Sequence, residues 1–136
     1  MSYQSFSILC TSAGFPGAIN SSGIVTLYRA TDAKSAESFV ASGVSLSGGT
    51  MVLGGDGLWT TIDHESAWYW AIANVPVVDT RVIVSFGLSL SVINGCLADT
   101  PPSIEWYPQD LSVQFLPQSF ELLNAHRTDV QVQFLE

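Results

Sequence analysis

The chain has 136 residues, of which 47% are hydrophobic, and this length and composition suit a single domain (residues 1–136) around one core. Twelve Asp and Glu against four Lys and Arg give a net charge of −8, which disfavours nucleic-acid binding because that binding depends on neutralised phosphates. No apolar stretch approaches the ~20 residues of a membrane span, and the start of the sequence lacks the basic segment of a signal peptide. We therefore expect a protein of the cytoplasm, or one delivered into a target-cell cytoplasm, with no membrane or nucleic-acid partner and an acidity that suits a neutralising partner protein.

The first half of the sequence mixes strand-like and helix-like segments. Capping residues frame both helices: Thr31 or Asp32 precedes the first and Gly43 follows it, and Asp63 precedes the second. The second helix is apolar nearly all round, so we expect it to be buried on most sides. The predicted elements are a strand over residues 3–10, a loop over 12–23, a strand over 24–29, a helix over 33–42, a short strand over 51–53, a strand over 57–62 and a helix over 64–74.

The second half is dominated by predicted strands. They cover residues 80–86, 110–116, 120–123 and 130–135, with a small-residue segment over 88–100 and a Pro-rich link over 101–108. Strands and helices in this order predict an α+β fold with a mainly antiparallel sheet and two short helices.

Cysteine and histidine are sparse. Two cysteines in a domain with an adequate core are typical of buried thiols, so we expect Cys10 and Cys96 to form no disulfide. His64 and His126 have no ligand partners at metal-binding spacing, so no metal site is predicted.

Three segments resemble the motifs of one enzyme family. "LYRAT" (residues 27–31) precedes a helix that ends "FVASGV", and "GLWTTIDHESAWYWA" (57–71) follows a glycine-rich stretch. This pattern resembles the ADP-ribosyltransferase-like fold family, in particular the small mono-ADP-ribosyltransferases of toxins and effectors, with features shared with the poly(ADP-ribose) polymerase branch. The resemblance implies a split, mainly antiparallel β-sheet core with NAD as the substrate, and an acceptor that is an unknown protein or small molecule.

The resemblance also assigns residues to the NAD site. In the arginine-type enzymes of the family, an aromatic-Arg pair ends the first core strand and a hydroxyl-rich strand follows. In the poly(ADP-ribose) polymerase branch a histidine replaces the arginine, and a tyrosine in the next helix stacks on nicotinamide, so this chain combines features of both branches. Arg29 would then anchor NAD, Thr60 and Thr61 would line the ribose, and Tyr69 or Trp59 would face the nicotinamide ring. The cofactor-binding residues so predicted are Tyr28, Arg29, Ala30, Trp59, Thr60, Thr61 and Tyr69. The alternative for Arg29 is a surface ion pair with Asp32.

The third motif departs from the family. The run "VQFLPQSFELL" (residues 113–123) has the family's shape, but the family's catalytic glutamate is missing, and Gln114 stands near its place. Gln114 can hydrogen-bond a ribose hydroxyl but supplies no charge, whereas Asp110 or Glu105 would supply the carboxylate that stabilises an oxocarbenium-like state. Three functions therefore stay open: a mono-ADP-ribosyltransferase, a non-catalytic module that binds NAD or an ADP-ribose-type nucleotide, and a structural subunit.

The motif order makes a geometric prediction. The strands that carry Arg29 and Thr60 should be neighbours, although about thirty residues separate them. Arg29, Thr60 and Tyr69 should converge on one cleft, with the strand of Gln114 beside it and Asp110, Gln114 or Glu105 at its rim.

Overall fold

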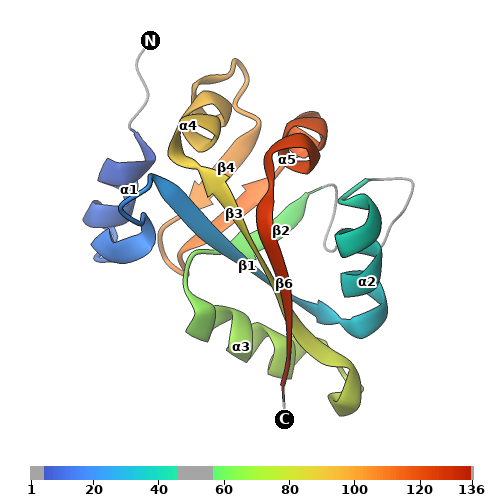
Figure 1. The fold of residues 1–136 in the computed structure, drawn as a ribbon. Helices are drawn as coiled ribbons and strands as arrows, with labels where there is room; N and C mark the ends of the chain where they lie inside the picture. Colours follow the sequence, from blue (N-terminus) through green and yellow to red (C-terminus); the bar gives the residue numbers. More distant parts are fainter. Residues whose placement is uncertain (1–4, 46–56, 136) are drawn as a thin grey trace.

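The computed structural model describes residues 5–45 and 57–135, which form an α+β fold with six strands in one open antiparallel sheet and five α-helices (Figure 1). The strands lie in the order β4-β5-β2-β1-β3-β6. Their bounds are β1 Ile24–Asp32, β2 Leu58–Thr61, β3 Arg81–Ser89, β4 Ile104–Tyr107, β5 Ser112–Phe115 and β6 Thr128–Phe134. The helices are α1 Phe6–Ser12, α2 Ala33–Ser42, α3 His64–Asn74, α4 Leu90–Ala98 and α5 Phe120–His126.

The main core lies on one face of the sheet. Phe39 of α2 packs against Phe86 of β3, and Phe86 packs against Phe115 of β5. Helices α1, α4 and α5 add apolar side chains to the same cluster, which is fully removed from water. Burial of this apolar area is the largest favourable contribution to the fold.

Helix α3 covers the opposite face. Phe86 is opposite Leu27 in the β1–β3 register, so the next residue of β1, Tyr28, points to the other side of the sheet. The Tyr28 ring contacts the ring of His64 in α3, with 5.2 Å between centroids. Helix α3 is therefore separated from α2 by the sheet.

The centre of the sheet is its weakest junction. Strands β1 and β2 are neighbours, as the motif order requires, but they share one register pair, Tyr28 with Thr61. Strand β1 pairs with β3 along its whole length, and β2 pairs fully with β5. The sheet thus consists of two three-stranded halves, and β1 and β2 diverge on the side of Arg29 and Trp59.

The predicted helix ends are confirmed. The Asp32 Oδ1 accepts a hydrogen bond of 2.7 Å from the Ser35 N–H at the start of α2, and the Asp63 Oδ1 accepts one from the Glu65 N–H at the start of α3. Gly43 ends α2 with a φ of +81°, a conformation that other residues rarely adopt.

Three short helices were not predicted. Residues 3–10 were expected to form a strand, but α1 begins at Phe6; residues 120–123 were also expected to form a strand, but they begin α5. The segment over 88–100 contains the end of β3 and helix α4. In all three helices, buried residues three or four positions apart supply a helical apolar face: Phe6 and Cys10, Ile93 and Cys96, Phe120 and Leu123.

Two other expectations need correction, and one lies outside the described residues. The Pro-rich link over 101–108 contains β4, which pairs with β5. Helix α3 is not buried on most sides. One side of the helix packs against the sheet, and Trp68, Tyr69 and Ile72 on its other sides are exposed. The predicted strand over 51–53 falls in the undescribed segment.

Both cysteines are free and buried, as expected of core thiols. Within residues 5–45 and 57–135, none of the helices has the length and apolar character needed to cross a membrane.

Candidate functional site

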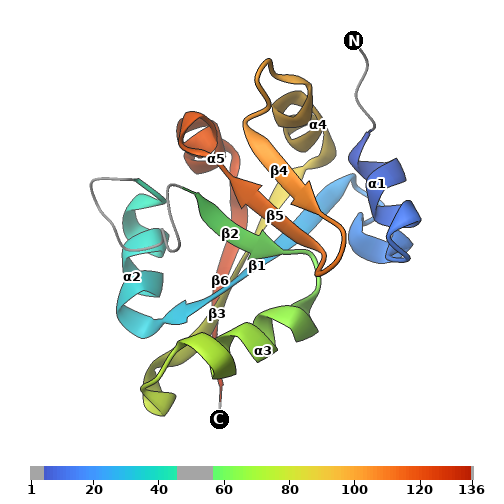
Figure 2. The same cartoon turned by 180° about the vertical axis from the view of Figure 1, so that it is seen from behind.

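A pocket of about 470 Å³ lies where β1 and β2 diverge, within the size range of small-molecule sites. Its walls come from the end of β1, from β2, from the second half of α3 and from the turn between β4 and β5; Figure 2 shows these elements from the side of β2 and α3. The lining residues are Arg29, Ala30, Trp59, Trp70, Asn74, Val75 and Asp110.

Arg29 is the most unusual residue of the pocket because its charge is buried and only partly hydrogen-bonded. The side chain is 3% exposed, and its Nη1 donates to the Trp59 carbonyl oxygen at 3.1 Å. The Nε and Nη2 atoms are buried, and no described residue accepts a hydrogen bond from either. A buried donor without an acceptor costs free energy, and the cost is larger for a charged group. Within residues 5–45 and 57–135, the guanidinium thus keeps two buried donor atoms without an acceptor.

Burial lowers the pKa of Arg29 from its ordinary value to about 10, while the nearby charge of Asp32 acts in the opposite direction. Asp32 uses its Oδ1 to cap α2, and it makes no ion pair with Arg29 within hydrogen-bonding distance. The surface ion pair considered as an alternative from the sequence is thus wrong.

Two indole rings form the apolar part of the pocket. Trp59 comes from β2 and packs on the ring of Tyr107 in β4, with 5.1 Å between centroids. Trp70 comes from α3, on the helix face that also carries Ala67, Ala71 and Asn74. Both indoles are half-buried, so each keeps part of its surface free for a flat ligand.

The end of α3 is held in place by Arg81 at the start of β3. The Arg81 Nε donates to the Val75 carbonyl oxygen at 2.7 Å, and its Nη2 donates to the Ile72 carbonyl oxygen at 3.1 Å. A guanidinium at a helix C-terminus satisfies free carbonyls and opposes the negative end of the helix dipole. Arg81 thereby fixes the wall that contains Trp70 and Asn74.

Asp110 reaches the pocket from the tight turn between β4 and β5. Leu111 in this turn has a φ of +58°. The Thr61 Oγ1 donates to the Leu111 carbonyl oxygen at 2.9 Å, and the Ile62 N–H donates to the same oxygen at 3.0 Å. Thr61 therefore acts on the site through the turn that carries Asp110.

Four of the residues expected from the sequence line this pocket: Arg29, Ala30, Trp59 and Asp110. The predicted convergence of Arg29 with a threonine hydroxyl and the Tyr69 ring is not observed. The Thr60 Oγ1 is buried and donates to the Val113 carbonyl oxygen at 2.8 Å. Tyr69 is 62% exposed and contacts Trp68, and the adjacent Trp70 lines the pocket instead.

The remaining expected residues lie around the site. Tyr28 lines a separate pocket beside His64, on the other side of Thr61. Gln114 is nearly buried and pairs in register with Trp59 on one side and Glu105 on the other. The Glu105 Oε1 accepts a hydrogen bond of 2.6 Å from the Tyr107 hydroxyl at the sheet edge. Of the three candidates for the catalytic group, Asp110 is thus the one that lines the same pocket as Arg29.

Sequence reasoning missed Trp70, Asn74 and Val75. The signal was present: Ala67, Trp70, Ala71 and Asn74 have the spacing of one helical face, and the two alanines allow close approach to the sheet. Within the described parts of the chain, no group of three His, Cys, Asp or Glu side chains could hold a metal ion.

No family model, curated protein or solved structure matches this chain.

Proposed function

We propose that the pocket binds NAD or a related ADP-ribose-type nucleotide, with Arg29 as the anchor. The observation that carries the proposal is the buried guanidinium, two of whose donor atoms have no acceptor among the described residues. A phosphate or carboxamide oxygen fits these donors, since arginine presents a rigid fork that matches such acceptors. The position of Arg29, at the end of a central strand and before a capped helix, is also the one that the "LYRAT" motif assigns to the NAD anchor.

The other walls suit the rest of such a ligand. Trp59 and Trp70 offer flat apolar surfaces to a nicotinamide or adenine ring. Asn74 adds an amide that can both donate and accept. The pocket thus offers a positive charge at Arg29 for a phosphate group and flat apolar surfaces at the two indoles for a ring.

A second candidate function, mono-ADP-ribosyl transfer from NAD to an unidentified acceptor, is favoured by Asp110. A carboxylate beside the ribose would stabilise the positive charge that develops as the nicotinamide bond breaks. Asp110 is exposed and faces the same pocket as Arg29, so it can take this part although the family's glutamate is missing. Gln114, one strand away from the pocket residue Trp59, would support the site without supplying charge.

Calorimetric titration with NAD and ADP-ribose tests the binding proposal. The Arg29→Gln variant should weaken binding by ~1.5–3 kcal/mol, the range for a charge-assisted hydrogen bond. Lys34→Gln is the matched control because it removes the same charge from an exposed position on α2 outside the pocket. Binding that is equally weak in both variants, or absent at millimolar ligand, would contradict the proposal.

Release of nicotinamide and transfer of labelled ADP-ribose to proteins of a cell lysate test the transferase activity. Asp110→Asn should abolish both while keeping NAD affinity, and Glu105→Gln, in a different groove, should change neither. NAD binding without turnover in the wild-type protein would leave the non-catalytic module as its function.

A further inference from the structure

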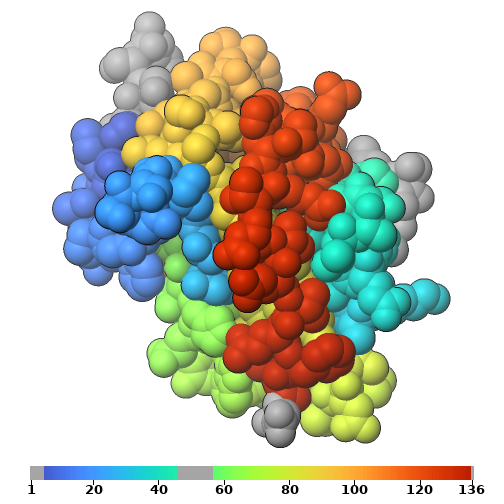
Figure 3. Space-filling model, in the orientation of Figure 1, coloured from blue at the N-terminus to red at the C-terminus, as the bar shows by residue number. Residues whose placement is uncertain are grey.

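Strand β6 is an open edge of the sheet. It is last in the strand order, pairs with β3 on one side, and has no described strand on its other side. Six of its seven residues are exposed, and Figure 3 shows it in red along the surface beside α2. Proteins usually protect such an edge with lysine, proline or a very short strand. Residues 128–134 contain neither lysine nor proline.

The outward backbone groups of β6 can be assigned from its register. The Leu135 N–H donates to the Arg81 carbonyl oxygen, so Arg81 and Leu135 are a hydrogen-bonded pair. Hydrogen-bonded pairs alternate with non-bonded pairs along an antiparallel ladder. The N–H and C=O groups of Val132 and Phe134, which belong to non-bonded pairs, therefore point away from β3. A register shift between Ser85 and Gly87 interrupts the ladder beyond Gln131, so this assignment is confined to Val132 and Phe134.

The same residues border an apolar groove of about 310 Å³ between β6 and α2. Val132 and Phe134 form its strand side, and Ala36 and Val40 contribute to its helix side. Phe134 is 58% exposed and Val40 is 46% exposed, which is unusual for such large apolar side chains next to each other. An incoming strand would therefore gain both main-chain hydrogen bonds and apolar contact.

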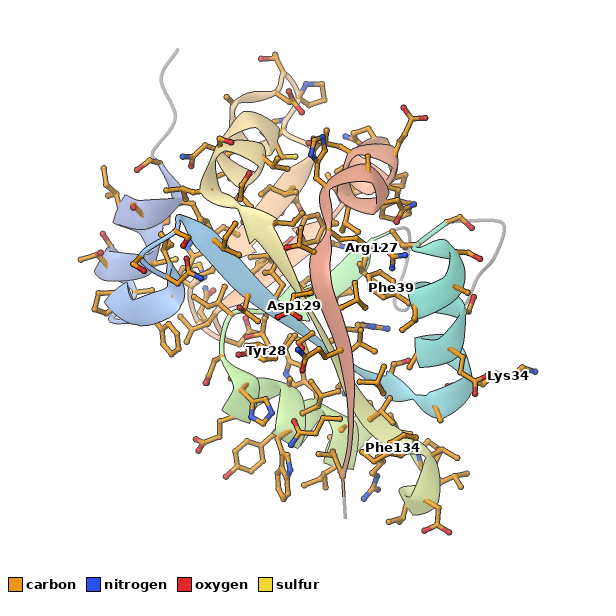
Figure 4. All side chains as sticks on the ribbon, in the orientation of Figure 1. Tyr28, Lys34, Phe39, Arg127, Asp129 and Phe134 are labelled. Carbon is orange, nitrogen blue, oxygen red and sulfur yellow. The ribbon has the colours of Figure 1, made fainter. Side chains whose placement is uncertain are left out.

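Charge indicates what can pair here. The chain has a net charge of −8, but two of its four basic residues, Lys34 on α2 and Arg127 just before β6, lie on the segments that border this groove. Figure 4 shows Lys34 projecting outward from α2 and Arg127 between the start of β6 and α2, where it donates hydrogen bonds to the carbonyl oxygens of Phe39 and Val40. The nearby acids are Glu37, which lines the groove, and Asp129. Two copies of this acidic protein thus meet here without the repulsion that opposes contact elsewhere.

We infer that β6 pairs with β6 of a second copy, antiparallel about a two-fold axis at Val132, to join two sheets into one. Pairing of the outward backbone groups allows the register in which Val132 meets Val132 and Val130 meets Phe134 of the second copy. A β-branched residue opposite an aromatic one is a favourable cross-strand pair. On the other face, Gln131 meets Gln133, and Asp129 has no like charge opposite it. The interface is isologous, as in most soluble dimers, and its residues lie outside the pocket of Arg29.

Sedimentation and light scattering over a wide range of protein concentration test this inference. The wild-type chain should show twice the mass of one chain, and Phe134→Lys should reduce the mass to that of one chain. Ile8→Lys on α1 is the matched control, because Ile8 is also exposed but lies away from β6, and this variant should remain dimeric. Unchanged circular dichroism would show that both variants fold.

Cysteine crosslinking tests the register. Val132→Cys should form an intermolecular disulfide under mild oxidation, because a bonded cross-strand pair has Cα atoms ~5.5 Å apart, within disulfide range. Phe134→Cys should not, because its two copies would lie ~13 Å apart in this register. The native cysteines are buried and do not interfere. A monomer at every concentration, or a dimer that resists Phe134→Lys and does not crosslink through position 132, overturns the inference; a monomer would leave the edge for a strand of another protein.

Discussion

Replacement of Arg29 by methionine should stabilise the ligand-free protein. The pKa of Arg29 falls to about 10, more than two units below its ordinary value, because burial disfavours its charge. At ~1.4 kcal/mol per pKa unit, this shift corresponds to a cost of the order of 3 kcal/mol at neutral pH. The charged hydrogen bond to the Trp59 carbonyl oxygen offsets ~2 kcal/mol of that cost. Methionine keeps most of the apolar stem, so the net gain should be ~1 kcal/mol.

The sign of the pH dependence follows from the same shift. Because the folded-state pKa lies below the unfolded-state value, the cost is fully present at pH values below about 10 and is relieved as the pH rises above about 10. The stability advantage of Arg29→Met should therefore be greatest at neutral pH and should decrease above pH 10.

Urea unfolding of the wild type, Arg29→Met and Lys34→Met measures this effect. Lys34 is exposed, so its replacement should change the free energy of unfolding by less than ~0.5 kcal/mol. NAD should stabilise the wild type and Lys34→Met but not Arg29→Met. If Arg29→Met instead loses more than ~2 kcal/mol without ligand, the guanidinium has strong partners within the chain, and the reasoning for a ligand anchor fails.

Two further predictions concern the backbone and the core. Gly43→Ala should destabilise the protein by ~2 kcal/mol or more in thermal unfolding, because the φ of Gly43 is +81° and an added Cβ would lie 2.1–3.0 Å from atoms of Asn124. Gly17→Ala is the control and should be nearly neutral, because Gly17 has an ordinary φ and open space around it. Cys10 and Cys96 should resist a thiol reagent at pH 8 in the folded protein and react fully in denaturant; rapid labelling of either would show that its helix opens easily. Burial raises the pKa of Cys10 from 9.0 to about 11. The stability that its neutral thiol contributes is therefore present below pH 9 and is lost between pH 9 and about 11. In Cys10→Ala, the free energy of unfolding should not show this decrease between pH 9 and 11.

Local signals made a large part of the fold predictable. Asp32, Gly43 and Asp63 define helix ends by their own chemistry, so α2 and α3 were placed correctly. The apolar runs of β1 and β3 and the Val-Gln alternation of β6 identified strands in the same way.

The rest depended on contacts between distant residues. Helices α1 and α5 have seven residues each, and so short an apolar pattern does not separate a helix from a strand. The residues of the site were likewise only partly predictable from local sequence patterns. Arg29, Trp59 and Asp110 were expected, but the choice of Trp70 over Tyr69 depends on which side of α3 meets the sheet, and tertiary packing decides that.

Arg81 links two features that are far apart in function. Its side chain holds the end of α3 beside the pocket of Arg29, and its carbonyl oxygen accepts a hydrogen bond from Leu135 at the end of the open edge. A displacement of β3 at this residue would reach both places. Binding at the pocket and pairing at β6 are therefore expected to influence one another. If pairing changes the affinity of the pocket for the proposed nucleotide by some factor, thermodynamic linkage requires that the nucleotide change the affinity of the dimer by the same factor.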